Sequence, residues 1–276
     1  MLKGNRILEG KKVGVVGGGK MGGALIEGMI ACGMVTASAL TVSDTDEARL
    51  VELAKAYGVG VTADNRVAAG GADLVILSVK PQNMDQVLSG LAGAATSALF
   101  ISIAAGITTA FIEERLGKSV RVVRVMPNLP ALIGEGAAAL APGALATRED
   151  LELARAIFTS VGLAVEVEES LMDAVTGLSG SGPGYVFLII EALTDAGVRM
   201  GLARDTALAL SAQSLLGAAK LCLRGEKPPA ELRAMVTSPG GTTLAGLKVL
   251  EDGNLRQMLI SAVEAATRRA AELGGR

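Results

Sequence analysis

The chain has 276 residues, half of them apolar, which is enough to bury the cores of two globular domains. Its formal net charge is −2 at pH 7 with acids and bases interleaved, which excludes the basic surface of a nucleic-acid or membrane-surface binder. Histidine is absent, which excludes Ser-His-Asp hydrolysis, His-ligated metal sites and the His-centred hydride chemistry of 2-hydroxy-acid dehydrogenases. We therefore expect small molecules and further copies of the chain as partners.

The first residues and the cysteines bear on the cellular compartment. The segment MLKGNRILEGKK has no apolar stretch long enough for a signal peptide, and the apolar run PGYVFLII is interrupted by Glu191 well short of a membrane span. Cys32 and Cys222 lie far apart, with no second thiol or imidazole at metal-ligand spacing. We expect a soluble, cytoplasmic protein without a disulfide framework or a metal site.

A glycine-rich turn follows the first apolar run, at residues 12–16, and leads into a helical pattern. Its pattern is G-x-G-x-x-G at Gly17, Gly19 and Gly22, where the glycines permit a tight turn, approach to a pyrophosphate and helix packing. A glycine-rich turn of purely structural purpose is the alternative. The context favours dinucleotide binding, because a second strand at residues 40–43 is followed by Asp44, whose carboxylate can accept from the adenosine ribose.

Asp44 also bears on which nicotinamide cofactor is used. Its charge would repel a 2′-phosphate and no arginine stands directly beside it, so the sequence favours NADH over NADPH. Two alternatives remain open at this point. Asp44 could instead cap a helix predicted at residues 46–56, and Arg49, one turn further on, could still reach a phosphate.

Strand and helix patterns alternate through the rest of the first half. Strands are predicted at residues 59–61, 74–79, 99–103 and 120–125, with helices at residues 84–91 and 108–116 between them. Unbroken apolar strands form a parallel sheet covered on both faces, and such sheets bind ligands at the carboxyl ends of the strands. We expect Lys80, Pro81 and residues 104–106 and 126–128 to line a nicotinamide cleft there. A solvated strand-end lysine is the alternative for Lys80.

The second half becomes helical. After an apolar stretch at residues 136–140, a helix at 147–160 and a last strand at 164–167, helices are predicted at residues 185–196, 204–224, 229–236 and 254–273. The predicted fold class is α/β, with an N-terminal Rossmann-type dinucleotide-binding domain at residues 1–168 and an all-helical C-terminal dimerisation domain at residues 169–276.

The first two of these helices are too apolar for a small domain to cover. The helix at residues 185–196 is apolar nearly all round, and that at 204–224 is rich in Ala and Leu. We expect a second copy of the chain to bury them, giving a homodimer through this half. Burial inside the same chain is the alternative.

Two polar motifs flank this helical region. GLSGSGP at residues 177–183 places Pro183 in the first turn of the apolar helix. A similar motif in β-hydroxyacid dehydrogenases is followed by a catalytic lysine, and Val186 occupies that position here. VTSPGGTT at residues 236–243 can form a turn whose backbone N–H groups suit a carboxylate. A helix cap at Thr242 or Thr243 is the alternative.

With these motifs assembled, the chain resembles the pyrroline-5-carboxylate reductases nearly end to end. The similarity rests on GGGKMGGALIEGM, VKP, AAG, RVMPNLPALIGEG, DAVTGLSGSGPGYVF, LLGAAKL and VTSPGGTTLAGLKVLE. It implies reduction of a cyclic imine by NADH or NADPH, the last step of proline biosynthesis, and dimers that often assemble into decamers. Many members have an arginine where this chain has Thr45, a departure that weakens the case for NADPH.

The resemblance also implies which residues bind the ligands. Those it implies at the cofactor are Gly17, Gly19, Met21, Gly22, Asn65, Val79, Lys80, Pro81, Ala104, Ala105 and Gly106, and we also expect Lys20, Ser43 and Asp44 there from their places in the glycine-rich turn and at the end of the second strand. Residues 104–106 would approach the nicotinamide. Those expected at the substrate are Glu226, Ser238, Gly241, Thr242 and Thr243, with Glu226 beside the ring nitrogen. A glutamate that is simply exposed is the alternative for Glu226.

The expected chemistry is compatible with the absence of histidine. The substrate imine is basic enough to arrive protonated, so the enzyme mainly has to position the ring against the cofactor. We expect the Thr243 hydroxyl to bond the ring nitrogen and act as the catalytic residue. Two other functions compete: a β-hydroxyacid-type dehydrogenase, against which Val186 argues, and a nonenzymatic dinucleotide sensor, against which the motif at residues 236–243 argues.

Overall fold

The computed structural model describes residues 7–94, 97–117 and 119–275. The opening residues 1–6, part of the segment considered for a signal peptide, lie outside this range. The chain folds into two compact units: Met1–Ser181 together with Ala265–Arg276, and Gly182–Glu264. Residues 169–181, which the sequence pattern assigns to the helical half, belong to the first unit.

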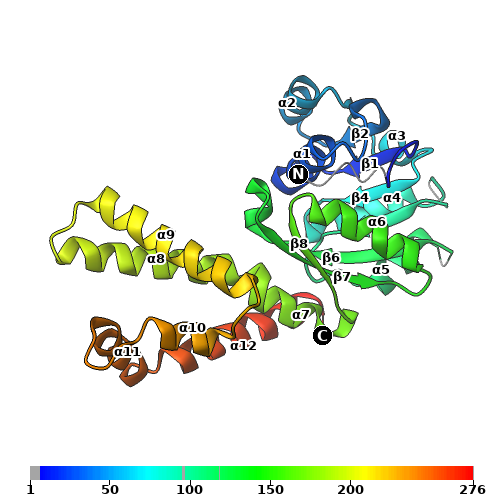
Figure 1. Cartoon of the computed structure of the whole chain (residues 1–276). Helices are drawn as coiled ribbons and strands as arrows, with labels where there is room; N and C mark the ends of the chain where they lie inside the picture. Colours follow the sequence, from blue (N-terminus) through cyan, green and yellow to red (C-terminus); the bar gives the residue numbers. More distant parts are fainter. Residues whose placement is uncertain (1–6, 95–96, 118, 276) are drawn as a thin grey trace. The chain divides into compact units, whose positions relative to one another are not determined.

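The first unit is built on an eight-stranded sheet with the order β3-β2-β1-β4-β5-β6-β7-β8 (Figure 1). The strands are β1 (Val13–Val16), β2 (Leu40–Ser43), β3 (Gly60–Thr62), β4 (Leu74–Leu77), β5 (Leu99–Ser102), β6 (Arg121–Met126), β7 (Gly136–Pro142) and β8 (Gly162–Glu166). All neighbours run parallel except β6 and β7, which are antiparallel. The chain order reverses between β1 and β4, which in such sheets is where a crevice opens at the carboxyl ends of the strands.

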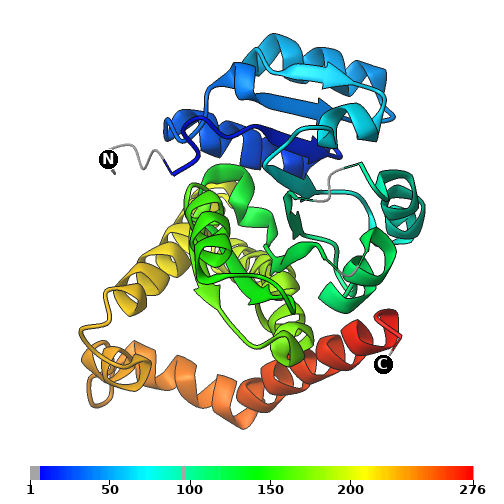
Figure 2. The same ribbon diagram turned by 90° about the vertical axis from the view of Figure 1, so that its right-hand side faces the viewer.

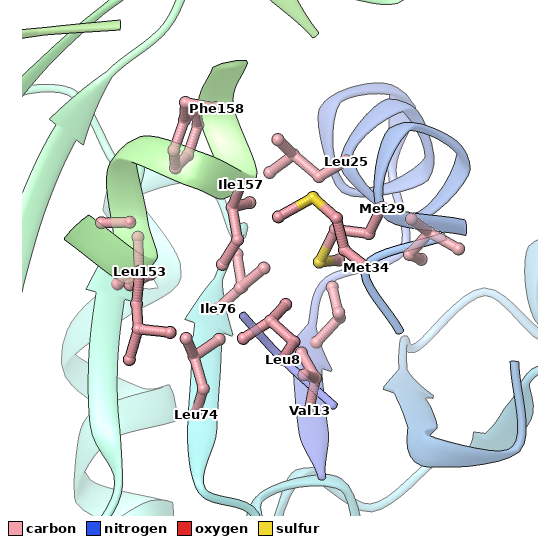
Figure 3. Close-up of a cluster of buried hydrophobic side chains, with 14 of the residues drawn as sticks. Leu8, Val13, Leu25, Met29, Met34, Leu74, Ile76, Leu153, Ile157 and Phe158 are labelled. Carbon is pink, nitrogen blue, oxygen red and sulfur yellow. The ribbon is translucent and has the colours of Figure 1, made fainter. Parts of the chain in front are cut away.

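Helices cover both faces of the sheet, as predicted. They are α1 (Lys20–Ala31), α2 (Glu47–Tyr57), α3 (Asn65–Ala69), α4 (Met84–Leu91), α5 (Thr109–Leu116) and α6 (Arg148–Thr159). Figure 3 shows one face, where Leu25 and Met29 of α1 meet Ile157 and Phe158 of α6 above Ile76 of β4. The other face has a second cluster, in which α4 and α5 pack on the sheet. The sheet is therefore buried on both sides.

Local signals fix the ends of several helices. Asp46 caps α2, where its carboxylate accepts from the Arg49 amide, and Thr147 caps α6 in a reciprocal capping box with Asp150. The Tyr57 hydroxyl at the end of α2 donates to Glu27 Oε2 of α1 at 3.0 Å. Burial of the phenol and this carboxylate raise the pKa of Tyr57.

A helical segment follows β8 within the same unit. A 3-10 turn (Glu169–Leu171) leads into α7 (Met172–Val175) and then a π-helical turn (Thr176–Gly180), closed by the Ser181 amide donating to the Thr176 carbonyl at 2.8 Å. Single π-helical turns occur frequently at functional sites. The sequence did not predict this geometry for the GLSGSGP motif.

The second unit is entirely helical. It contains α8 (Gly182–Arg199), α9 (Arg204–Leu223), α10 (Pro229–Met235), α11 (Thr242–Asp252) and most of α12 (Leu255–Leu273). Helices α8 and α9 lie side by side in Figures 1 and 2, and they approach closely where Gly197 faces Ala207. Proline is the second residue of α8, as the sequence predicted.

The apolar side chains of α8 and α9 are largely uncovered in the single chain. Thr194 is the buried residue of α8 and Ala207 that of α9, whereas Leu188 is 65% exposed and Leu210 is 56% exposed. The alternative that one chain buries these helices is therefore wrong. By length and composition alone, α9 could also cross a membrane.

Candidate active site

The glycine-rich turn has the geometry that a bound anion needs. Gly17 adopts φ +100°, and a Cβ there would lie 2.5 Å from the Ser78 carbonyl oxygen. Gly22 packs against the Gly17 carbonyl, whereas a Cβ on Gly19 would meet open space. Gly19 precedes α1 without a side-chain cap, so the first N–H groups of α1 have no acceptor from that residue. An open backbone at the start of α1 suits a pyrophosphate.

Two side chains hold Gly18 in this turn. The Gly18 amide donates to Asp44 Oδ2 at 2.7 Å, and Arg49 Nε donates to the Gly18 carbonyl at 2.7 Å. Asp44 Oδ1 also accepts from the Asp46 amide at 3.0 Å, and Arg49 forms an ion pair with Glu52. The alternative that Asp44 caps α2 is wrong, because Asp46 occupies that position. The alternative that Arg49 serves a phosphate is not supported, since its guanidinium is engaged with Gly18 and Glu52.

A cavity of about 800 Å³ lies at the carboxyl ends of β1 to β4. Its lining residues are Gly17, Gly19, Ser43, Asp44, Thr45, Ala63, Asp64, Asn65, Arg66, Ser78, Val79, Lys80, Asn83, Gln86, Val87 and Gly90. Its volume is in the range of small-molecule and cofactor sites. Seven predicted cofactor residues line it: Gly17, Gly19, Ser43, Asp44, Asn65, Val79 and Lys80. The other predicted residues are not part of this lining: Lys20, Met21, Gly22, Pro81, Ala104, Ala105 and Gly106.

Asn65 is oriented in the cavity wall by a buried hydroxyl. Ser43 Oγ donates to Asn65 Oδ1 at 2.8 Å, and Ser43 is fully buried. Because the amide oxygen accepts this bond, the Asn65 amide donors remain for a ligand. This arrangement suits a ribose hydroxyl or a phosphate oxygen.

Arg66 is a cavity residue that the sequence analysis missed. Its Nε donates to the Gly90 carbonyl of α4 at 2.6 Å, and its amide donates to Asp64 Oδ1 at 2.8 Å, which starts α3. The guanidinium therefore lies at the cavity rim where α3 meets α4, near the apolar Val87. The signal that could have located it is its position in the segment after the third predicted strand, since residues that follow parallel strands share one edge of the sheet.

The predicted nicotinamide loop, residues 104–106, lies beyond β5 at the same edge of the sheet. Gly106 has φ +77°, and a Cβ there would lie 3.4 Å from Gly274 after α12. Figure 2 shows the red C-terminal end of α12 beside this part of the first unit. At the end of β6, Asn128 accepts from the Ala137 amide at 2.8 Å and donates to the Ser179 carbonyl at 3.0 Å. Asn128 thus ties the end of β6 to the π-helical turn.

The predicted substrate motif lies in the second unit, between α10 and α11. Gly240 adopts φ +69°, and the Gly241 amide donates to the Ser238 carbonyl at 3.0 Å, which closes a tight turn. Gly241 is the N-cap of α11 and makes no side-chain cap. Thr242 and Thr243 are the first two residues of the helix, so the alternative that either one caps it is wrong. Glu226 is exposed in the segment between α9 and α10.

This helix start offers donors to an anion. The first amides of α11 have no intrahelical acceptor, and the first turn carries no acidic residue. Exposed hydroxyls of Ser238 and Thr242 flank these amides, and the Thr243 side chain is half-buried. The turn can therefore hold a carboxylate and still present a hydroxyl. In the described part of the chain, no group of three Cys, Asp or Glu side chains is placed to hold a metal ion.

Comparison with known proteins connects both units to one enzyme. The family model described as pyrroline-5-carboxylate reductase dimerisation matches residues 169–273, and the model described as NADP oxidoreductase coenzyme F420-dependent matches residues 12–106. A pyrroline-5-carboxylate reductase of Methanosarcina acetivorans is 48% identical, with 97% of this chain and 99% of the relative covered. The chain belongs to the pyrroline-5-carboxylate reductase family. It therefore reduces pyrroline-5-carboxylate with a nicotinamide cofactor in proline biosynthesis.

Solved structures of pyrroline-5-carboxylate reductases confirm the predicted two-part fold. That of Coxiella burnetii has a TM-score of 0.90 at 40% identity, covering 95% of this chain and 98% of the other. That of Plasmodium falciparum, with NADP bound, has a TM-score of 0.86 at 32% identity, covering 96% and 99%. Prephenate dehydrogenase of Aquifex aeolicus, at 15% identity and a TM-score of 0.53, shares the fold only. The competing dehydrogenase and sensor functions are thereby set aside.

Proposed function

We propose that this pyrroline-5-carboxylate reductase prefers NADH to NADPH and holds the substrate carboxylate at the turn before α11. The observation that supports the carboxylate site is the start of α11, where Gly241 precedes two threonines and no side chain caps the helix. A carboxylate at this position would accept from amides that otherwise have only water. Ser238, Gly241 and Thr242 would provide this carboxylate site.

The ring nitrogen needs a separate partner. The substrate nitrogen arrives protonated, so the chain does not have to supply an acid before the C=N bond is reduced. Thr243 would accept a hydrogen bond from this nitrogen and fix the orientation of the ring. Glu226 carries a negative charge that would stabilise the iminium, and its exposure leaves it accessible. Both groups bind and orient the substrate.

The cavity at β1 to β4 fits a dinucleotide. It offers an open backbone beside Gly19, hydrogen-bonding side chains at Asn65 and Lys80, and apolar surface at Val79 and Val87. The bound cofactor supplies the hydride. The chain's own residues supply the anion site, the ribose contacts and the exclusion of water.

The preference for NADH is argued from the end of β2. Asp44 lines the cavity with a carboxylate, and Thr45 beside it is uncharged. Arg49 donates to Gly18 and pairs with Glu52, so its guanidinium is already engaged and is not placed to bind a 2′-phosphate. A 2′-phosphate next to Asp44 would therefore meet a negative charge. Lys80 on another wall would still permit use of NADPH.

The oligomer is argued from the apolar surface of α8 and α9. Side chains such as Leu188 and Leu210 are more than half exposed in one chain, and these helices lie within the matched dimerisation model. A partner chain would bury them, which accounts for the apolar composition of α9 without a membrane. We propose a soluble, cytoplasmic homodimer that can assemble further into a decamer.

One set of assays tests this proposal. Purified protein is given pyrroline-5-carboxylate with NADH or NADPH, and its mass is measured by light scattering in buffer without detergent. We expect turnover with both cofactors, a higher kcat/KM with NADH, and a mass of at least two chains. A higher kcat/KM with NADPH would refute the cofactor preference. A monomer, or a protein that needs detergent, would refute the assembly.

A further inference from the structure

A partly buried ionic cluster in the first unit involves none of the predicted cofactor or substrate residues. The Glu169 carboxylate, at the start of the 3-10 turn before α7, accepts two hydrogen bonds from Thr109. The Thr109 amide donates to Oε1 at 2.8 Å and the Thr109 hydroxyl donates to Oε2 at 2.6 Å. Thr109 is the first residue of α5, so Glu169 satisfies an amide that α5 itself leaves without an acceptor.

Arg124 of β6 is the third member of this cluster. It is 1% exposed, and its guanidinium lies 3.3 Å from Glu169 Oε1. A buried arginine is tolerated when its charge is paired, because burying an unpaired charge costs several kcal/mol. Arg124 thus holds the Glu169 carboxylate against β6, and the carboxylate in turn holds Thr109.

The segment that this cluster fixes is the loop between β5 and α5. At its first end, the Ile103 amide donates to the Leu77 carbonyl at 3.1 Å, which continues the sheet. At its other end, the loop enters α5 at Thr109. Between these ends, the Ile107 amide donates to the Ala104 carbonyl and the Ala104 amide donates to Ser102 Oγ, both at a long 3.4 Å. The position of the loop therefore also depends on how firmly Thr109 is held.

We propose that Glu169 is a positioning residue for hydride transfer. It fixes Thr109, and through Thr109 it sets the position of residues 104–106, against which the nicotinamide ring packs. This inference rests on the proposed function and on the placement of the nicotinamide beside that loop, which the family resemblance implies. Glu169 itself contacts neither substrate nor cofactor. Misplacement of reacting groups by about 1 Å can reduce a rate by about a hundredfold.

The test compares two neighbouring threonines of α5. Thr109→Val removes the hydroxyl bond to Glu169 Oε2 and keeps the amide bond to Oε1. Thr108→Val is the matched control, because the Thr108 hydroxyl oxygen accepts from the Phe111 amide as the N-cap of α5 and is not bonded to Glu169. Both substitutions remove one side-chain hydrogen bond at the same helix end. Thr109→Ser restores the hydroxyl.

The readouts are the single-turnover rate of hydride transfer, the primary deuterium isotope effect on kcat and the KM for NADH. For Thr109→Val we expect a rate about tenfold lower, an isotope effect on kcat that increases as the chemical step becomes limiting, and a KM within twofold. Thr109→Ser should recover most of the rate. Thr108→Val should lower Tm by a similar amount and leave the rate within twofold.

Two outcomes would overturn the inference. One is an unchanged single-turnover rate in folded Thr109→Val, and the other is an equal loss of rate in Thr108→Val, which would indicate a purely structural role. If Thr109→Val does not fold, Thr109→Ala is judged by the same criteria. The unmodified enzyme in the same assay separates this inference from the functional proposal, because its turnover with NADH tests only the latter.

Discussion

Asp44 Oδ2 accepts a hydrogen bond from the Gly18 amide at 2.7 Å, so the acidic residue at the end of β2 helps to hold the glycine-rich turn. The same carboxylate lines the cofactor cavity. One side chain therefore influences both the shape of the pyrophosphate site and the charge beside the adenosine ribose. A substitution that changes the charge but keeps a hydrogen-bond acceptor can separate these two effects.

Asp44→Asn should shift cofactor preference toward NADPH. The amide oxygen can still accept from Gly18, whereas the bond from the Asp46 amide and the negative charge that opposes a 2′-phosphate are lost. We expect the ratio of kcat/KM for NADPH over NADH to rise about five- to tenfold, which corresponds to roughly 1 kcal/mol. Adding Thr45→Arg should raise the ratio further.

Asp46→Asn is the matched control for this experiment. Asp46 caps α2 through the Arg49 amide and is not among the residues that line the cavity. It should leave the cofactor ratio unchanged. An equal shift in both variants would show that the general charge of this region, and not the position of Asp44 in the cavity wall, determines the preference between NADH and NADPH.

Arg66→Ala should weaken both cofactors equally. The Nε bond to the Gly90 carbonyl places the planar guanidinium at the cavity rim, where it can stack on the adenine ring. We expect the KM for NADH and that for NADPH to rise about three- to tenfold, with kcat within twofold, because the nicotinamide loop is untouched. Arg66→Lys should recover little, since lysine keeps the charge but lacks the planar group.

An exposed arginine elsewhere provides the control for Arg66. Arg115 of α5 pairs with Asp85 and does not line the cavity, so Arg115→Ala should leave both KM values unchanged. If Arg66→Ala raised the KM for NADPH alone, Arg66 would be a phosphate contact and the stacking prediction would be wrong.

The sequence predicts long elements better than short ones, which is why Arg66 was not predicted as a site residue. Strands β1, β2, β4 and β5 were predicted within one or two residues, because long apolar runs determine them. Helix α3 has only five residues, which is too few to show a helical period in the sequence. No helix was therefore predicted after β3, and Asn65 was the one residue of this segment expected at the cofactor. A strand was predicted at residues 120–125, but the role of Arg124 depends on Glu169, which is 45 residues away.

The direction of β7 relative to β6 could not be predicted from the sequence either. Its apolar pattern is that of a strand, yet the pattern does not distinguish parallel from antiparallel pairing, and β7 runs antiparallel to β6. The short connection from Met126 to Gly136 contains a 3-10 turn instead of a long helix. A connection without a crossover helix is what antiparallel neighbours permit.

Thr243→Val should reduce catalysis without destabilising α11. Since Gly241 is the N-cap and makes no side-chain bond, loss of the Thr243 hydroxyl does not remove a helix cap. We expect kcat/KM for pyrroline-5-carboxylate to fall by about 1 to 3 kcal/mol, with Tm nearly unchanged. Thr243→Ser should restore most of the activity.

Thr237 offers a comparison in the same turn. Its hydroxyl donates to the Arg233 carbonyl at 2.7 Å, so Thr237→Val removes a local bond of α10. That variant should lose a little stability and keep its kcat/KM. Normal kinetics in a folded Thr243→Val variant would remove Thr243 from the catalytic machinery.

The pairing of Arg124 with Glu169 predicts an asymmetric effect on stability. Glu169→Gln leaves the buried Arg124 without a counter-charge, which should cost about 3 to 5 kcal/mol. Arg124→Met should cost less, because the Glu169 side chain is 26% exposed and keeps both bonds from Thr109. In the double variant, Arg124→Met should recover most of the stability lost through Glu169→Gln.

Thermal unfolding of all three variants at one fixed protein concentration measures these differences in stability, since dimer stability depends on concentration. A double variant no more stable than Glu169→Gln alone would show that the unpaired charge is not the source of the loss.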